Sequence, residues 1–194
     1  MKTVIIDNYD SFTYNLAHLV RELGFSADVF RNDKFALEDL AGYDKIILSP
    51  GPGLPSEAGL LESVIKEYSD KKPILGICLG EQAIGEVYGA KLTNLPKVFH
   101  GMQTPVRLLH DADDYIFRNL PDEIPVGRYH SWVVDRKGFP KCLEIIAEDL
   151  PASGERGLIM ALRHRDCDIH GLQFHPESIL TPDGKTIISN WLNY

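Results

Sequence analysis

The sequence has few cysteines, no long apolar run and no excess of positive charge. Its three cysteines, Cys78, Cys142 and Cys167, are odd in number and widely separated, which does not suit a disulfide framework and favours a reducing cytoplasm. Lysine and arginine number 20 against 28 acidic residues and form no basic cluster, so we expect no nucleic-acid partner. The sequence shows no signal-peptide pattern and no apolar segment of bilayer length, so we expect no membrane association.

Apolar residues make up 44% of the 194 residues and are spread along the whole chain, which predicts a single domain over residues 1–194. In the first half, short apolar strands at 4–6, 27–30, 45–48 and 73–77 alternate with helices at 12–23, 60–68 and 80–88. Ser11 has the character of a cap for the first helix. This alternation is typical of a parallel sheet with helices on both faces.

The second half has a different pattern, with proline and glycine between short apolar runs. It predicts strands at 102–109, 124–134, 143–149, 158–164 and 169–174, followed by a final helix at 184–193. We therefore expect an α/β fold. A mostly parallel central sheet would be accompanied by a smaller antiparallel sheet from the second half.

Residues 76–80 read GICLG and lie where the fourth predicted strand meets a helix. A nucleophile between two such glycines is typical of a sharp strand-to-helix turn that exposes one side chain in strained geometry. The reactive form of cysteine is the thiolate, and a helix N-terminus stabilises that anion. We predict Cys78 as a nucleophile, although the segment alone also fits a buried structural cysteine. Cys142 and Cys167 lack this setting, and we interpret both as structural.

A second candidate site follows the last predicted strand, where residues 173–178 read QFHPES. The residue before a proline prefers an extended backbone, and alternate residues of an extended segment face the same side. We therefore expect His175 and Glu177 to project together, with His175 as general base and acid and Glu177 as the carboxylate that orients it. The triplet alone also fits an ordinary turn, but beside the cysteine turn it predicts a catalytic triad of Cys78, His175 and Glu177.

A rigid loop, SPGPG at residues 49–53, follows the third predicted strand. Sites in open α/β sheets form at the carboxyl ends of strands, so this loop should meet Cys78 at the end of the neighbouring strand. We predict that the backbone N–H groups of Gly53 and Leu79 form an oxyanion hole. The loop has no lysine and no Walker pattern, so it does not predict nucleotide binding, and a plain rigid turn is the alternative.

His164, Cys167 and His170 have a three-residue spacing that metal ligands also use. Arginine and aspartate residues interrupt the group, and a hairpin loop between two strands is the better interpretation. We predict no metal site and no cofactor.

Together these segments resemble the class I glutamine amidotransferase subunits of anthranilate synthase and of para-aminobenzoate (aminodeoxychorismate) synthase, over nearly the full length. Residues 7–15, DNYDSFTYN, are the most specific for these two subunits. The cysteine turn and the His-Pro-Glu segment occur across the wider class. Residues 49–53, 129–131 and 173–180 also match.

The resemblance implies the same triad, and it implies a fold and activity like those of these subunits. It also implies six glutamine-binding residues: Gly51, Pro52, Gly53, Gln82, Ser131 and Trp132. L-glutamine would be hydrolysed through a cysteine thioester. The glutaminase elements use nearly the whole chain, so the ammonia would pass to a chorismate-binding synthase subunit, with anthranilate synthase slightly preferred. The alternatives are a stand-alone cysteine amidohydrolase of another γ-glutamyl substrate and a non-catalytic regulatory subunit.

Two positions depart from the pattern of these subunits. Glu81 stands where many of them have histidine, and Met102 stands where lysine is common. A carboxylate at residue 81 is close in sequence to the helix N-terminus that is expected to stabilise the thiolate, and it would weaken that effect if it pointed inward. We expect the side chain of Glu81 to face solvent.

Overall fold

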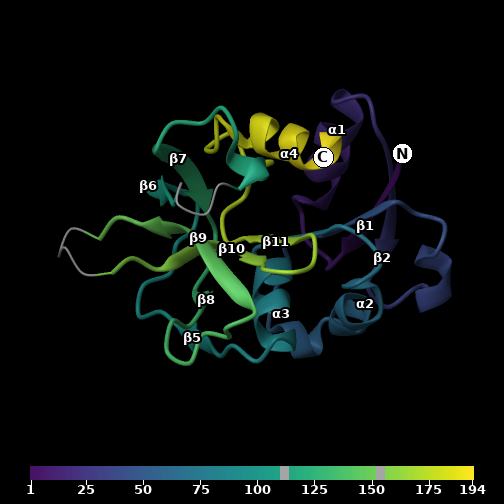
Figure 1. Ribbon diagram of the computed structural model, residues 1–194, viewed down its shortest axis with the longest axis horizontal. Helices are drawn as coiled ribbons and strands as arrows, with labels where there is room; N and C mark the ends of the chain where they lie inside the picture. The colour runs from purple at the N-terminus through teal and green to yellow at the C-terminus, as the bar shows by residue number, and fades with distance from the viewer. Residues whose placement is uncertain (110–113, 152–155) are drawn as a thin grey trace.

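Short apolar strands form a nine-stranded sheet, and its central strands are buried because helices cover both faces (Figure 1). The structure is a computed structural model that describes residues 1–109, 114–151 and 156–194. The order across the sheet is β2-β1-β3-β4-β11-β10-β9-β6-β7. The strands are β1 (Lys2–Asp7), β2 (Ser26–Arg31), β3 (Lys45–Leu48), β4 (Ile74–Ile77), β6 (Met102–Leu108), β7 (Glu123–Arg128), β9 (Leu143–Asp149), β10 (Ile159–His164) and β11 (Ile169–Leu172).

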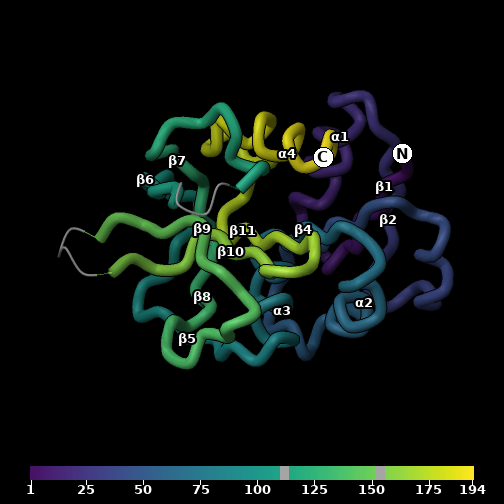
Figure 2. The backbone as a smooth tube through the Cα atoms, in the orientation of Figure 1, coloured from purple at the N-terminus to yellow at the C-terminus, as the bar shows by residue number. Residues whose placement is uncertain are grey.

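The strands from β2 to β11 in this order are parallel, and the strands from β10 to β7 extend the sheet in antiparallel fashion. A separate two-stranded antiparallel sheet consists of β5 (Leu92–Asn94) and β8 (Trp132–Val134). The predicted α/β class with a parallel sheet and a smaller antiparallel one is confirmed. Figure 2 shows β1, β2 and α2 of the first half on one side of the molecule and the antiparallel strands of the second half on the other, whereas α4 returns to lie beside α1.

Each face of the sheet packs against two helices. One apolar cluster includes Leu16 of α1 (Thr13–Glu22) and Ile188 of α4 (Gly184–Asn193). The other includes Leu61 of α2 (Leu61–Tyr68) and Ala83 of α3 (Leu79–Val87). Among the described residues, three short 3-10 helices lie in the connections: η1 (Leu37–Leu40), η2 (Pro55–Glu57) and η4 (Tyr115–Phe117). None of the helices in the described part of the chain is long and apolar enough to cross a membrane.

Two local predictions are wrong. Ser11 is not the cap of α1, because the N-cap residue is Phe12 and it has no side-chain cap hydrogen bond. Instead the Asp10 carboxylate accepts the amide of Phe12 at 2.8 Å, and the Asp7 carboxylate accepts the hydroxyl of Thr13 at 2.8 Å. The single strand expected at 124–134 is two strands, because the chain leaves the main sheet after β7 and enters the small sheet at β8.

The register between β4 and β11 positions the candidate site. Gly171 pairs with Gly76, and Leu172 pairs with Ile77. The amide of Cys78 continues this pairing and donates to the carbonyl oxygen of Leu172 at 2.7 Å. The next residues of both strands, Cys78 and Gln173, therefore leave the sheet side by side at its carboxyl edge.

Candidate active site

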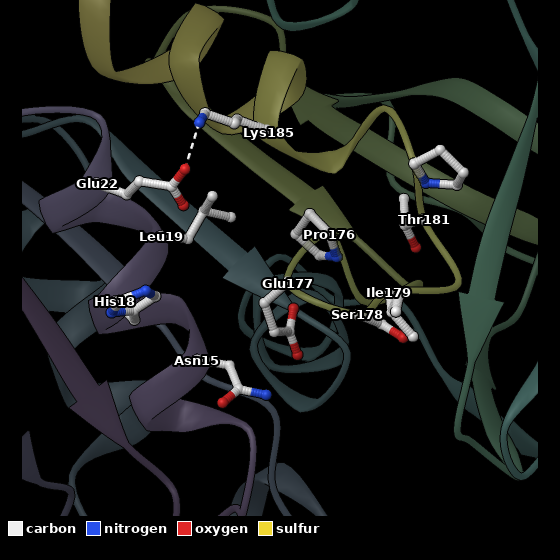
Figure 3. A pocket seen from close by; sticks show the side chains of 11 residues that line it. Asn15, His18, Leu19, Glu22, Pro176, Glu177, Ser178, Ile179, Thr181 and Lys185 are labelled. Atoms are coloured by element: carbon white, nitrogen blue, oxygen red, sulfur yellow. Dashed lines mark hydrogen bonds and ion pairs between the residues drawn. The ribbon is translucent and has the colours of Figure 1, made fainter.

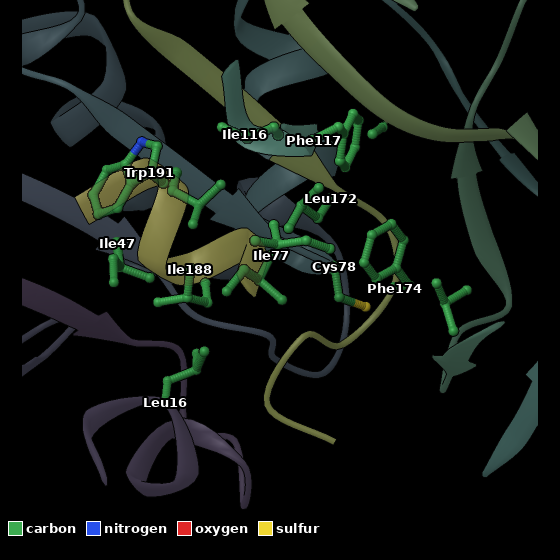
Figure 4. Close-up of a cluster of buried hydrophobic side chains, with 14 of the residues drawn as sticks. Leu16, Ile47, Ile77, Cys78, Ile116, Phe117, Leu172, Phe174, Ile188 and Trp191 are labelled. Carbon is green, nitrogen blue, oxygen red and sulfur yellow. The ribbon is translucent and has the colours of Figure 1, made fainter. Parts of the chain in front are cut away.

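Cys78 occupies the sharp turn between β4 and α3, where it is the N-cap residue of the helix. Its φ of 52° is in the left-handed region, which is costly for a residue with a side chain. Both flanking glycines are required by space: a Cβ atom on Gly76 would lie 2.5 Å from the backbone of Gly80, and one on Gly80 would lie 2.6 Å from the carbonyl oxygen of Leu48. The predicted strained turn is confirmed. Figure 4 shows the Cys78 side chain at the border of the apolar cluster.

His175 and Glu177 form a buried pair. The Nδ1 atom of His175 lies 2.7 Å from Oε1 of Glu177, and the two side chains are 3% and 0% exposed. Burial alone would lower the pKa of His175, but the charge of Glu177 and the neighbouring Cys78 raise it well above 6.5. The imidazolium is therefore stabilised between the carboxylate and the sulfur. Within the described residues Nε2 has no hydrogen-bond partner, so it is the ring nitrogen available for proton transfer.

The two side chains meet for a different reason than the sequence suggested. The amide of Ser178 donates to the carbonyl oxygen of His175 at 3.2 Å, so the segment is a turn and not an extended strand. The hydroxyl of Thr181 donates to the same oxygen at 2.6 Å and holds the turn in place. Proline is favoured at the second position of such a turn, which is where Pro176 lies.

Aromatic rings surround the His175 imidazole. The ring centroids of Phe12 and Tyr129 lie 5.4 Å and 4.8 Å from that of His175, both with edge-to-face geometry. Phe12 and Tyr129 also contact each other at 5.1 Å, and the Tyr129 hydroxyl lies 3.1 Å from the Ser178 hydroxyl. Packed rings of this kind restrict the rotation of the imidazole and keep Nε2 in one direction.

Cys78 borders two cavities. The first has a volume of about 220 Å³ and contains all six residues that were expected to bind glutamine. Its lining residues are Gly51, Pro52, Gly53, Cys78, Gln82, Tyr129, His130, Ser131 and Trp132. The second has a volume of about 420 Å³ and shares Gly51, Pro52, Cys78 and Tyr129 with the first, and its other walls come from residues 9–12, Pro50, His100 and His175. Cys78 thus borders a polar pocket and an adjoining cavity that is lined by His175.

The loop at residues 49–53 meets the nucleophile turn, as expected. A Cβ atom on Gly51 would lie 2.7 Å from Cδ2 of Leu79 and 2.6 Å from Cβ of Asn8, so only glycine allows this close approach. The carboxamide of Asn8 donates to the carbonyl oxygen of Ser49 at 2.8 Å and fixes the start of the loop. Gly53 has a φ of 74° and lines the first cavity. The oxyanion-hole role of Gly53 and Leu79 stays a prediction.

The family model for glutamine amidotransferase class-I matches residues 4–193. The chain belongs to this family. It is 42% identical over 191 residues to anthranilate synthase component 2 of Pseudomonas aeruginosa, across 97% of this chain and 94% of that relative. It is 43% identical over 192 residues to aminodeoxychorismate synthase component 2 of Escherichia coli, across 98% of both. Among solved structures, a Thermoplasma acidophilum protein provisionally assigned to GMP synthase superposes with a TM-score of 0.86 at 28% identity, across 100% of this chain and 92% of that one.

Glu81 of this amidotransferase is buried, which corrects the expectation that it faces solvent. Its exposed fraction is 0%, and neither carboxylate oxygen has a hydrogen-bond partner among the described residues. Gly171 of β11 makes room for it, because a Cβ atom there would lie 2.5 Å from Cγ of Glu81. Burial raises the pKa of Glu81 well above 4.5 and favours the neutral acid. A neutral side chain does not oppose the thiolate, so this departure is compatible with an active nucleophile.

Two buried polar residues of the site were not predicted. Gln173 is fully buried and contacts both Cys78 and Gln82. His130 lines the first cavity, and burial together with the charge of Arg128 lowers its pKa to about 3, so it is neutral. The available signal was weak: Gln173 follows β11 directly and His130 lies two residues after the end of β7, and polar residues at such places are also common in ordinary loops.

A third cavity of about 460 Å³ lies between α1 and the segment that follows His175 (Figure 3). Asn15 and His18 of α1 line one side, and residues 176–182 line the other. The ion pair between Glu22 and Lys185, at 2.5 Å, spans α1 and α4 at its border. Cys78 does not line this cavity, so it is not the reaction pocket.

The group His164, Cys167 and His170 does not converge on one point. His164 accepts the amide of Cys167 at 3.0 Å, whereas Nε2 of His170 lies 3.0 Å from Asp114 and its Nδ1 lies 3.4 Å from Asp168. The part of the chain that the structure describes contains no group of three side chains placed to hold a metal ion. His170 instead joins β11 to the segment before η4.

Proposed function

We propose that this chain is a glutaminase subunit that hydrolyses L-glutamine to glutamate and supplies the ammonia to a chorismate-using synthase subunit. One observation carries the proposal: the 220 Å³ cavity contains Cys78 and the six residues that the family resemblance relates to glutamine, and His175, paired with the buried Glu177, lines the adjoining cavity together with Cys78. The cavity has the size and polarity for one amino acid.

In the proposed mechanism, the Cys78 thiolate attacks the side-chain amide carbon of glutamine, and the developing oxyanion is held by the N–H groups of Gly53 and Leu79. The imidazolium of His175 donates its proton to the departing nitrogen, which leaves as ammonia. A γ-glutamyl thioester remains on Cys78. His175 then removes a proton from water, the hydroxide attacks the thioester, and glutamate leaves as the thiolate is restored. Glu177 keeps the ring oriented throughout.

The acceptor of ammonia is proposed to lie on another protein. The relatives named above are component 2 subunits of anthranilate synthase and of aminodeoxychorismate synthase, and both names imply a component 1. The second cavity, which is lined by residues 9–12, adjoins the glutamine pocket at Cys78 and would offer ammonia a second exit from the sulfur. A partner docked over this opening would shield ammonia from protonation by water. Anthranilate synthase is slightly preferred, and the free thiols of the chain fit a cytoplasmic complex.

Steady-state glutamate release tests the proposal, measured for the purified chain alone and with chorismate and a synthase subunit. We expect slow glutamate release by the chain alone, because ammonia made without an acceptor wastes glutamine. We expect faster release in the complex, because a synthase subunit docked over the opening at residues 9–12 would complete the site. Full turnover by the chain alone would instead favour a stand-alone amidohydrolase. Absence of glutamate release under both conditions would favour a non-catalytic regulatory subunit.

A further inference from the structure

Gln173 connects the nucleophile to the substrate pocket. Its side-chain nitrogen lies 3.6 Å from Sγ of Cys78, a normal separation for a hydrogen bond to sulfur, and its exposed fraction is 0%. Its side-chain oxygen accepts from Nε2 of Gln82 at 3.0 Å. The same nitrogen of Gln82 donates to the carbonyl oxygen of Trp132 at 2.9 Å. A series of contacts, buried at its sulfur end, thus runs from Cys78 to Trp132, which also lines the glutamine cavity.

The orientation of the Gln82 and Gln173 side-chain amides follows from the carbonyl oxygen of Trp132, at which this series of hydrogen bonds ends. The carbonyl oxygen of Trp132 can only accept a hydrogen bond, so the nitrogen of Gln82 must face it. That nitrogen also faces Gln173, which must therefore present its oxygen. A reversed Gln173 would place two N–H donors against each other. The nitrogen of Gln173 is consequently the group that points at the sulfur, and the amide acts there as a donor.

The backbone holds Gln173 rigidly at this place. Its amide donates to the carbonyl oxygen of Met160 in β10 at 2.9 Å, and the neighbouring Leu172 accepts the amide of Cys78 at 2.7 Å. The sulfur and the Gln173 side chain are therefore fixed to the same sheet edge. An N–H group that points at sulfur stabilises the anion more than the neutral thiol. It also restricts the rotation of the Cys78 side chain.

We propose that Gln173 is a positioning residue that holds the Cys78 sulfur as a thiolate and links its position to the Ser131–Trp132 side of the glutamine pocket. The inference rests on the proposed function in one respect, since it takes Cys78 as the nucleophile. It adds a neutral donor to a site whose charges otherwise come from His175 and Glu177. A movement of the Trp132 segment on glutamine binding would reach the sulfur through two amide groups.

The pH dependence of Cys78 alkylation by iodoacetamide tests this role, because it reports thiolate formation and needs no glutamine. Two variants separate the contacts. Gln173→Met removes the donor to sulfur and the acceptor for Gln82, whereas Gln173→Glu keeps an acceptor for Gln82 but turns an acceptor toward the sulfur. We expect the midpoint of the alkylation profile to rise in both, with rates at neutral pH reduced about tenfold or more, because hydrogen bonds to charged groups are the stronger ones. Gln173→Glu should raise KM for glutamine less than Gln173→Met does.

Gln103→Met is the matched control, because Gln103 donates to the carbonyl oxygen of Leu180 at the surface and lines neither cavity beside Cys78. It should leave the alkylation profile unchanged. In the unmodified protein, the side-chain amide resonance of Gln173 should shift with the same midpoint as the alkylation rate, a measurement that depends on no variant. The proposal would be overturned if folded Gln173 variants had the alkylation profile of the wild-type protein. It would also be overturned if the side-chain amide resonance of Gln173 did not change with pH at the alkylation midpoint. Glutaminase activity retained by Cys78→Ala would instead overturn the proposed function.

Discussion

Glu177 contacts Nδ1 of His175 at 2.7 Å and leaves Nε2 as the ring nitrogen without a partner among the described residues. The carboxylate has two effects on the imidazole. It fixes the ring so that one nitrogen serves the reaction, and its charge is the main favourable contribution to the raised pKa of His175. The two effects can be measured separately, because ring orientation affects the rate of the reaction whereas the raised pKa of His175 affects the dependence of that rate on pH.

Replacing Glu177 with Gln should lower glutamine-dependent kcat/KM by at least tenfold, equivalent to about 1.4 kcal/mol of barrier. The alkaline limb of the pH–rate profile should move to lower pH, because loss of the carboxylate lowers the pKa of His175 and the imidazolium loses its proton earlier. Glu22→Gln is the control, since Glu22 is half-exposed and pairs with Lys185 at the surface. An unchanged alkaline limb in Glu177→Gln would mean that this carboxylate does not set the protonation of His175.

Glu81→Met should stabilise the protein, and the gain should grow with pH. The pKa of Glu81 is raised by burial in the folded state, so above its unfolded value of 4.5 the folded protein must retain a proton that the unfolded chain releases. Stability is therefore lost as pH rises toward the folded pKa, by up to about 1.4 kcal/mol per pH unit. Methionine has a similar shape and no proton to retain.

Urea unfolding of both proteins between about pH 5 and about pH 8 measures this difference. Glu67→Met is the matched control, because Glu67 lies on the exposed side of α2 and pairs with Lys71 in water. It should show no comparable pH trend. A constant difference between Glu81→Met and the wild-type protein across this range would show that Glu81 does not hold a proton in the folded state.

Much of the fold was predictable from sequence because the parallel half has a simple pattern. β3 at Lys45–Leu48 and α4 at Gly184–Asn193 have the predicted bounds, since proline and glycine follow β3 and precede or begin α4, and apolar periodicity marks the buried face of α4. The passage from β7 to β8 was missed because the residues between the two strands, 129–131, include neither glycine nor proline to mark a break. The local pattern of apolar and polar residues does not indicate which sheet a strand joins. The assignment of β7 to the main sheet and β8 to the small sheet therefore depends on tertiary packing.

The same limit applies to the site. That Cys78, His175 and Glu177 lie close together was predictable because their residue types and neighbours are chemically distinctive, and their catalytic role stays a prediction. Glu81 was misplaced because a glutamate in a helix is usually exposed. All residues from 79 to 85 of α3 are buried, however, and only the absence of a side chain at Gly171 on a distant strand makes the space for Glu81. Gln173 was missed because its contacts with Cys78 and Gln82 join residues that are far apart in the chain.

His170→Gln should destabilise the protein more at low pH than at high pH. His170 lies between the carboxylates of Asp114 and Asp168, at 3.0 Å and 3.4 Å. Burial opposes its charge, but these carboxylates raise its pKa above 6.5. The ion pairs therefore contribute fully below the unfolded value and are lost as pH rises through the folded pKa. We expect a loss of about 3 kcal/mol near about pH 6 and a smaller loss near about pH 9, measured by urea unfolding. An equal loss at both would mean that His170 is neutral in the folded protein.

Cys78→Ala in the complex with a synthase subunit tests the central claim most directly. In the proposed mechanism the thiol makes ammonia and does not use it, so the variant complex should release no glutamate and should form no chorismate-derived product from glutamine. The same complex should remain active when an ammonium salt replaces glutamine, which also shows that the variant folds and binds its partner. Glutamine-dependent product formation by Cys78→Ala at a rate near that of the unmodified complex would contradict the assignment of Cys78 as the nucleophile.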